Sequence, residues 1–390
     1  MDFSAKLHEV FTRVFDSGTP VKFFSPGRVN LIGEHIDYNG GLVLPCALTM
    51  GTYGAIAKRA DKAVTLISGN LAAPIQFDID QLVYDKAHDW GNYPKGVLKQ
   101  FVDRGHKLTG FDMYIIGNLP NGAGLSSSAS LNALVATAVN QVFDLGVDQV
   151  TLAKICQLAE HFNGVNCGIM DPFACILGKK DHGILLDCNT LEYSYAPLEL
   201  GKYQILIANT KYKRGLQDSK YNQRLAECNA ALKDLQRAVK INQLCDLKPM
   251  EFEACKHVID DDIHRNRAEH AVYENHRTKA AAQALAEGRL EDLYQLMEES
   301  HNSLRDLYDV VGDALEAMVS TTVKYADMNA HRILGTRMTG AGFGGCTVSI
   351  VHKDYTDDII SYVGKGYRKI TGTDASFYIA EVAQGAGAMA

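Results

Sequence analysis

The sequence lacks an excess of basic residues. Its 390 residues include 39 Lys and Arg against 46 Asp and Glu, which gives a formal net charge of −7. Because proteins that bind nucleic acid usually present a basic face, this balance argues against a nucleic-acid partner. Long apolar runs are also missing, and none approaches the roughly 20 residues of a membrane-spanning helix. Residues 1–10 carry mixed charge without the apolar centre of a signal peptide, so we expect no membrane association.

The sequence also has no C-x-x-C motif. Its nine cysteines are an odd number, and the nearest two, Cys167 and Cys175, stand eight positions apart. This usage is typical of scattered reduced thiols rather than of a disulfide framework or a zinc site. The 13 histidines form neither H-E-x-x-H nor zinc-finger spacing. We therefore expect a cytoplasmic protein.

Nothing in the composition departs from that of a globular protein, with 46% hydrophobic and 22% charged residues. The length suggests two or three domains. Strand-like and helix-like patterns alternate up to about residue 198, and the pattern restarts with a buried-type strand at 203–208. We predict a mixed α/β (α+β) fold with one domain at 1–198 and a helix-rich second domain at 199–390.

The first of three glycine-rich segments, residues 25–41, reads SPGRVNLIGEHIDYNGG. It places the polar side chains of Arg28, Glu34, His35 and Asp37 between apolar residues and turn signals. These groups could hydrogen-bond a polyhydroxylated ligand, or they could form a solvated loop with local ion pairs. The spacing alone does not decide between the two. We expect an extended chain around Ile36 that curves about the ligand.

The second segment, residues 119–130, reads LPNGAGLSSSAS and follows a predicted strand at 113–116. A predicted helix begins in it and continues to about residue 145. Free backbone N–H groups and the helix dipole make such a helix start a binding site for anions. A glycine turn with serine capping is the alternative. Three successive serines exceed the needs of a cap, which favours phosphate binding.

The third segment, residues 340–345, reads GAGFGG and satisfies G-x-G-x-x-G as a string. A dinucleotide fingerprint requires a helix after the glycines, whereas 346–351 is strand-like, so we reject that reading. The remaining interpretation is a glycine turn between two strands, which packs against a ligand or another loop. The glycine segments contain no Walker A ending, and the sequence lacks the H-R-D and D-F-G motifs of protein kinases.

A fourth candidate is Asp171, which stands among apolar residues in CGIMDPF at 167–173. A carboxylate in such surroundings can serve as a base in a partly dry pocket. The local sequence alone favours a plainer role, a helix N-terminal cap before Pro172.

Taken together and in this order, these segments resemble the small-molecule kinase superfamily of galactokinase, homoserine kinase, mevalonate kinase and phosphomevalonate kinase. Within it the resemblance is to the galactokinase family and runs nearly end to end. It is carried by five segments: 27–41, 120–130, 218–224, 270–277 and 337–345. The resemblance implies two mixed α/β domains with the active site in the cleft between them. It also implies that ATP phosphorylates the anomeric hydroxyl of galactose.

The family's functional residues carry over by position. Asp171 would be the catalytic base and Arg28 would stabilise charge near the transferred phosphoryl group. Ser128 and Glu160 would bind Mg²⁺, and Ser68 and Trp90 would lie near adenine. The sugar would be bound by Glu34, His35, Ile36, Asp37, Gly168 and Tyr221. The phosphates of ATP would be held by Gly122, Ala123, Gly124, Leu125, Ser126, Ser127 and Ser128.

The chain departs from the family pattern at three places. Ile36 stands where most galactokinases have Thr, and N-acetylgalactosamine kinases often share the Ile, so that sugar is an alternative substrate. Pro172 replaces a usual Gln, and the stretch from Glu160 to Asp171 is one residue short. A non-catalytic sensor of galactose and ATP is a further alternative. The complete serine loop and Asp171 argue against it. The sequence leaves the oligomeric state open, and a monomer is compatible with it.

Overall fold

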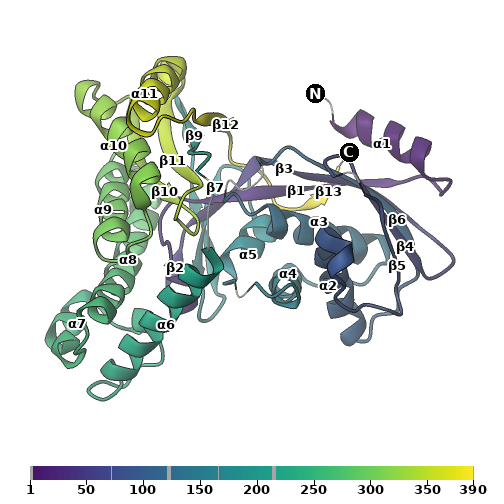
Figure 1. The fold of residues 1–390 in the computed structure, drawn as a ribbon, viewed down its shortest axis with the longest axis horizontal. Helices are drawn as coiled ribbons and strands as arrows, with labels where there is room; N and C mark the ends of the chain where they lie inside the picture. Colours follow the sequence, from purple (N-terminus) through teal and green to yellow (C-terminus); the bar gives the residue numbers. More distant parts are fainter. Residues whose placement is uncertain (1–2, 72, 121–123, 166, 213–216, 390) are drawn as a thin grey trace.

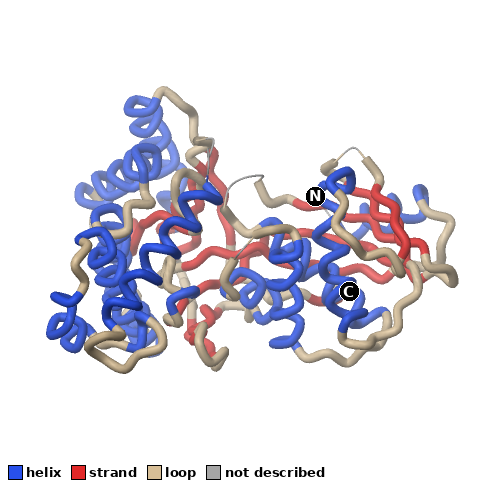
Figure 2. Tube along the Cα trace, turned by 60° about the horizontal axis from the view of Figure 1, so that its bottom comes forward, coloured by secondary structure: helices blue, strands red, loops and turns tan. Residues whose placement is uncertain are grey.

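The computed structural model describes residues 3–71, 73–120, 124–165, 167–212 and 217–389 (Figure 1). It confirms the expected mixed α/β fold. One end of the molecule is built on a six-stranded sheet and the other on a four-stranded sheet packed with helices (Figures 1 and 2). Within the described ranges, none of the helices combines the length and apolar character that a membrane crossing requires.

The six-stranded sheet has the order β13-β1-β3-β6-β4-β5 and is antiparallel except between β4 and β6. Its strands are β1 (Val21–Asn30), β3 (Pro45–Lys58), β4 (Ala63–Ser68), β5 (Ile75–Asp78), β6 (Phe111–Gly117) and β13 (Gly387–Ala388). The last of these comes from the far end of the chain. The sheet therefore contains both early and late residues.

Helices cover both faces of this sheet. On one face lies the amphipathic helix α1 (Phe3–Val14), whose Leu7 and Phe11 are buried against Ala55 and Tyr114. The other face is covered by α2 (Asn92–Asp103), α3 (Ser127–Val142), α4 (Gln149–Phe162) and α5 (Met170–Leu177) (Figure 1). Their apolar residues, such as Leu134 and Phe173, form the largest buried cluster. This packing fixes α3 and α5, the two helices that begin at the site.

The four-stranded sheet has the order β10-β11-β9-β12 and is antiparallel throughout. Its strands are β9 (Tyr203–Asn209), β10 (Ile333–Thr339), β11 (Cys346–His352) and β12 (Ser376–Ala380). Side chains alternate between its faces, so that Leu206 packs toward α10 (Gly312–Met328) and α11 (Thr356–Thr371). Its neighbours Ile205 and Ile207 pack on the opposite face.

The remaining elements connect these two parts. A small sheet of β2 (Leu42–Val43), β7 (His182–Asp187) and β8 (Tyr193–Pro197) packs against β3 and the long helix α8. The helices of this region are α6 (Gln217–Leu235), α7 (Pro249–Cys255), α8 (Asp262–Ala286) and α9 (Asp292–Asp306). The 3-10 turns are η1 (Asp37–Asn39), η2 (Lys86–Gly91), η3 (Leu244–Asp246), η4 (Lys256–Val258) and η5 (Lys353–Tyr355).

The three glycine-rich segments differ in how well the sequence predicted them. The second lies between β6 and α3, and the third forms the turn between the paired strands β10 and β11, as expected. The first was partly mispredicted, because β1 continues to Asn30 and includes Arg28. The extended chain expected around Ile36 is also wrong. His35 has a left-handed backbone with φ of 61°, and η1 follows directly. Backbone hydrogen bonds from Asn39 and Gly41 to the Ile36 carbonyl close this turn.

Candidate active site

The first and third glycine-rich segments line one cavity of about 260 Å³, and the second contacts Arg28 and Asp171 in the cavity wall. Small-molecule pockets span roughly 300–1,000 Å³, so this cavity suits a ligand as small as a monosaccharide. The Arg28 guanidinium joins the first segment to the second by donating to the Gly124 carbonyl at 2.8 Å. His35 joins it to the third, since its Nε2 lies 3.2 Å from the Ala341 carbonyl. Of the residues predicted for the site, seven line the cavity: Arg28, Glu34, His35, Asp37, Gly168, Asp171 and Tyr221.

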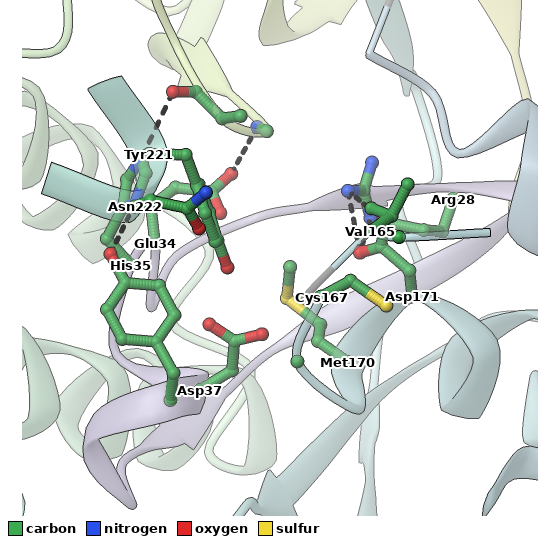
Figure 3. A pocket seen from close by; sticks show the side chains of 15 residues that line it. Arg28, Glu34, His35, Asp37, Val165, Cys167, Met170, Asp171, Tyr221 and Asn222 are labelled. Carbon is green, nitrogen blue, oxygen red and sulfur yellow. Dashed lines mark hydrogen bonds and ion pairs between the residues drawn. The ribbon is translucent and has the colours of Figure 1, made fainter. Parts of the chain in front are cut away.

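An arginine–carboxylate pair forms one side of the cavity (Figure 3). Nε and Nη2 of Arg28, on β1, donate to the two carboxylate oxygens of Asp171, on α5, at 2.7 Å each. Burial alone would lower the pKa of Arg28, but the Asp171 charge raises it above its ordinary value. The arginine therefore stays charged beside the carboxylate. Asp171 lies in the first turn of α5, after the N-cap position at Ile169, so the capping role favoured by the local sequence is wrong.

The described residues leave one acceptor position of Asp171 open. The Ser126 hydroxyl, in the second glycine segment, donates to the same carboxylate oxygen as Nη2 of Arg28. An ionised carboxylate has about four acceptor positions, and these three hydrogen bonds fill three of them. Because Asp171 also lines the cavity, the remaining position can accept a hydrogen bond from a ligand hydroxyl there.

Glu34 lies at the opposite side of the cavity, with its carboxylate held from several directions. It accepts hydrogen bonds from the Gly340 backbone N–H at 2.7 Å, from the Asn30 side chain at 3.0 Å and from Thr339 at 3.2 Å. Arg337 faces it at 3.5 Å. Glu34 thus belongs to the cavity wall and also ties the end of β1 to the turn after β10.

His35 is fixed beside Glu34 as a neutral ring. Burial, with a smaller contribution from His270, lowers the pKa of His35 to about 3. Because Nε2 faces the Ala341 carbonyl, it must carry the proton and donate. Nδ1 then accepts from the Tyr38 hydroxyl at 2.7 Å. The Tyr38 hydroxyl in turn lies 2.8 Å from that of Tyr308.

The Asp37 carboxylate points into the space between these two walls (Figure 3). Its position explains why residue 168 is glycine, since a Cβ there would overlap the carboxylate. Burial, reinforced by the charges of Asp171 and Glu34, raises the pKa of Asp37 to about 7. Tyr221 of α6 completes this part of the wall. Its ring lies 5.8 Å from that of His35 and 5.3 Å from that of Tyr38.

Ser128 and Glu160, the predicted magnesium ligands, meet between α3 and α4. Burial raises the pKa of Glu160 to about 7, although its interaction with the Ser128 side chain acts to lower it. Asn132 donates to Glu160 at 3.1 Å, while its own Oδ1 is buried without a hydrogen-bond partner. In the described part of the chain no three His, Cys, Asp or Glu side chains gather to hold a metal. Mg²⁺ often takes only one or two carboxylates and keeps waters and phosphate ligands, so these hard oxygen donors fit it.

Several predicted site residues lie away from the cavity. Ile36 is fully buried in the core and does not line the cavity, because the turn at residues 35–39 points it inward. Ser68 ends β4, where its hydroxyl caps the following turn, and Trp90 lies in η2, half-buried against the same core. Their role toward adenine stays a prediction. Gly122 and Ala123 lie outside the described residues. In the rest of that loop, Leu125 is buried and Ser127 is exposed.

Three family models and several curated proteins match the chain. A model described as the galactokinase galactose-binding signature matches residues 9–58. The GHMP kinase N-terminal and C-terminal domain models match residues 92–179 and 281–369. A galactokinase of Fusobacterium nucleatum is 52% identical over 97% of both chains, and one of Clostridium tetani is 50% identical over 97% of this chain and 96% of its own.

The chain belongs to the galactokinase family.

Solved structures give the same result. A Lactococcus lactis galactokinase in complex with galactose has 41% sequence identity and a TM-score of 0.94, covering 99% of this chain and 100% of its own. The mevalonate kinase of Methanococcus jannaschii, at 17% identity and a TM-score of 0.68, covers 94% of this chain and 99% of its own and shares the fold. The fold class expected from the sequence is therefore confirmed.

Sequence reasoning missed several residues of this galactokinase-family cavity. Tyr38, Gly340 and Ala341 stood inside the glycine-rich segments, Cys167 and Met170 inside the segment around Asp171, and Asn222 inside 218–224, so a signal for them was present. Only Gly164 and Val165, which follow α4, lay outside every segment that the sequence singled out. The missed lining residues are Tyr38, Gly164, Val165, Cys167, Met170, Asn222, Gly340 and Ala341.

Proposed function

We infer that the chain is a galactokinase, which transfers the terminal phosphoryl group of ATP to the anomeric hydroxyl of galactose. The observation that carries this inference is the Arg28–Asp171 pair, which borders a cavity of monosaccharide size next to the glycine- and serine-rich start of α3. The galactokinases that match this chain at about half identity over nearly its whole length support the same reaction.

Asp171 is proposed as the base. Its open acceptor position receives the anomeric hydroxyl, and the carboxylate takes or orients that proton as the oxygen attacks phosphorus. Arg28 holds the carboxylate in place, and its charge stabilises the negative charge that develops on the transferred group. Phosphoryl transfer depends mainly on such positioning and charge stabilisation, because the protein forms no covalent bond of its own.

The phosphates of ATP are proposed to lie at the start of α3, along residues 122–128. Helix N-terminal N–H groups and the helix dipole favour an anion there. Ser126 links this loop to the base through its hydrogen bond to Asp171. The nucleotide loop and the acceptor site are thus in direct contact.

Ser128 and Glu160 are proposed to hold Mg²⁺. The Asn132 Oδ1 atom is buried without a hydrogen-bond partner, and the Glu160 carboxylate is buried beside it. A bound cation would interact favourably with both oxygen-bearing groups. When bound, Mg²⁺ neutralises phosphate charge.

Asp37 is proposed to recognise the orientation of the sugar's ring hydroxyls. A carboxylate that accepts hydrogen bonds from ring hydroxyls is left unpaired by a sugar with the wrong hydroxyl orientation, and the resulting discrimination can reach roughly 10⁴-fold. Ile36 faces the core, so no observation at the cavity favours N-acetylgalactosamine over galactose.

We further propose that the enzyme works in the cytoplasm. All nine cysteines carry free thiols, which suits a reducing compartment that also supplies ATP.

The test is an assay of ADP release with galactose, glucose and N-acetylgalactosamine, each with and without Mg²⁺. We expect kcat/KM for galactose to exceed that for glucose by at least 10³-fold and to require the metal. Equal values for galactose and glucose, or a preference for N-acetylgalactosamine, would contradict the proposed substrate. Sugar binding without ADP release would point to a sensor instead.

A further inference from the structure

The residues that follow β12 also have a structural role. Residues 381–389, here called the C-terminal strap, leave the four-stranded sheet and run back along the six-stranded one. The strap first follows β3, where the Glu381 carbonyl accepts from the Thr49 N–H at 3.0 Å and the Ala383 N–H donates to the Ala47 carbonyl at 2.9 Å. Its small residues then allow it to pass beneath α5.

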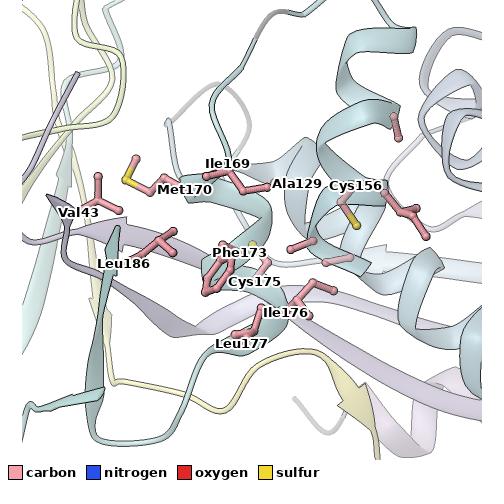
Figure 4. Close-up of a cluster of buried hydrophobic side chains, with 14 of the residues drawn as sticks. Val43, Ala129, Cys156, Ile169, Met170, Phe173, Cys175, Ile176, Leu177 and Leu186 are labelled. Atoms are coloured by element: carbon pink, nitrogen blue, oxygen red, sulfur yellow. The ribbon is translucent and has the colours of Figure 1, made fainter. Parts of the chain in front are cut away.

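The strap next binds the C-terminal end of α5, the helix that carries Asp171. Ala386 N–H donates to the Cys175 carbonyl at 2.8 Å, and Gly385 N–H donates to the Gly178 carbonyl at 2.7 Å. In Figure 4 the yellow C-terminal segment runs beside this end of the helix, near Ile176 and Leu177. Carbonyls at a helix end need partners from outside the helix, and the strap supplies one to Cys175.

The strap finally joins β1, the strand that carries Arg28. Its last part forms β13, which pairs with β1 at Phe23 and Phe24, and Met389 N–H donates to the Lys22 carbonyl at 2.9 Å. The same nine residues therefore hold both elements that supply the arginine–carboxylate pair. The hydrogen bonds that attach the strap to α5 and to β1 do not involve Arg28 or Asp171.

We propose that the C-terminal strap is a positioning element for catalysis, which fixes α5 against β1 so that Asp171 meets Arg28 and the substrate in the reactive geometry. The proposal rests on the function proposed above. Asp171 stands four residues before Cys175, which is about 6 Å along a helix. Because α5 has only eight residues and no side-chain N-terminal cap, a shift at its C-terminal end moves Asp171 with it. Misplacement of a reacting group by about 1 Å can lower a rate by 10²-fold.

Two glycines in the strap provide a matched test. A Cβ at Gly385 would overlap the Ile176 carbonyl and lie 2.8 Å from the Gly178 nitrogen, so Gly385→Ala must push the strap and α5 apart. A Cβ at Gly387 would find its nearest neighbour, the Gly385 carbonyl, at 4.0 Å. Gly387→Ala is therefore the same substitution in the same segment without the displacement.

The experiment measures kcat, the galactose dissociation constant and thermal unfolding for wild type, Gly385→Ala and Gly387→Ala. We expect Gly385→Ala to lower kcat by 10-fold or more while galactose binding stays within 2-fold, since Glu34, His35 and Asp37 do not touch the strap. Gly387→Ala should match wild type in all three. A variant that stops after Gln384 serves if Gly385→Ala does not fold, and it should show the same split between rate and binding.

The proposal is overturned if Gly385→Ala, or the shortened variant in its place, keeps kcat within 2-fold of wild type. It is also overturned if galactose binding falls in parallel with kcat, because the strap would then support the whole cavity rather than the reacting pair. Failure of the wild type to phosphorylate galactose would instead contradict the proposed function, so the two failures are distinguishable.

Discussion

At the residue scale, the carboxylates of Asp171 and Asp37 differ in the charged groups that surround them. Asp171 has the charge of Arg28 against both its oxygens, whereas no cation in the described part of the chain pairs with Asp37, which lies near other acids. The first is therefore positioned for the role proposed for it, to accept a proton from the sugar hydroxyl. The second shares a buried space with like charges, which makes its ionisation expensive.

We predict that Asp171→Asn lowers kcat by about 10²–10⁴-fold, because a positioned base contributes that much. Galactose and ATP should still bind. The measurement is ADP release at saturating substrates, with ligand binding by calorimetry. Asp112→Asn is the control, since Asp112 is a buried carboxylate outside the cavity that is also paired with an arginine, Arg59. A rate above one tenth of wild type in Asp171→Asn would remove Asp171 from its role as base.

Asp37 gives a prediction about stability and pH. Its pKa of about 7 in the folded protein lies above its ordinary value near 3.9 in the unfolded chain. Between these values the folded state holds a proton that the unfolded chain has released, so this residue makes the protein less stable as pH rises from about 4 to 7. Asp37→Asn should remove the effect, which is of the order of a few kcal/mol.

The measurement is thermal unfolding of the ligand-free wild type and Asp37→Asn between pH 4 and 8. The two should coincide near pH 4, and the variant should be the more stable above pH 7. A difference that does not change with pH would show that Asp37 is not the titrating group.

At the element scale, helix starts and strand ends carry the chemistry. The strand–loop–helix unit around residues 119–130 and the turn between β10 and β11 could be predicted, because glycine and serine clusters interrupt clear apolar patterns there. The extension of β1 could not, because Pro26 and Gly27 favour a turn in the local sequence. The structure absorbs them in a register shift between Pro26 and Arg28, a bulge that keeps the strand running.

Long-range pairing explains the other limits of prediction. The partners of residues 385–389 lie more than 200 positions earlier in the chain, and no local pattern indicates them. The inward turn of Ile36 depends on a left-handed His35, which a non-glycine residue seldom adopts. The division of the chain between residues 198 and 199 stays a prediction.

Helices α3 and α4 supply the next prediction. Ser128→Ala should raise the Mg²⁺ concentration for half-maximal rate by about 10-fold, because one hard oxygen ligand is lost. Excess metal should largely restore the rate, and the KM for galactose should not change. Thr137→Val, which removes a hydroxyl farther along α3, is the control. An unaltered magnesium titration in Ser128→Ala would leave Ser128 as a structural partner of Glu160.

At the scale of the whole molecule, the cavity lies where the two large sheets are joined. Asn30 and Glu34 at the end of β1 meet Thr339 and Gly340 at the end of β10 through buried hydrogen bonds. Arg337 of β10 is fully buried there, donates to the Asn30 and Leu31 carbonyls and faces Glu34. The same contacts that shape the sugar cavity thus also hold the two ends of the molecule together.

This double role allows stability and activity to be separated. Arg337→Met keeps most of the buried volume but leaves the Glu34 charge without its cation, and breaking a buried pair in this way costs about 3–5 kcal/mol of unfolding free energy. Adding Glu34→Gln removes the stranded charge, so the double variant should recover more than half of that loss. Recovery should be incomplete, because Arg337 also acts on Glu274: burial alone would raise the pKa of Glu274, and Arg277, His270 and Arg337 lower it. Galactose phosphorylation should stay low in the double variant, since Glu34 lines the cavity.

Urea unfolding measures the change in stability, and kcat/KM measures the change in activity. A double variant no more stable than Arg337→Met alone would show that Arg337 does not balance the Glu34 charge.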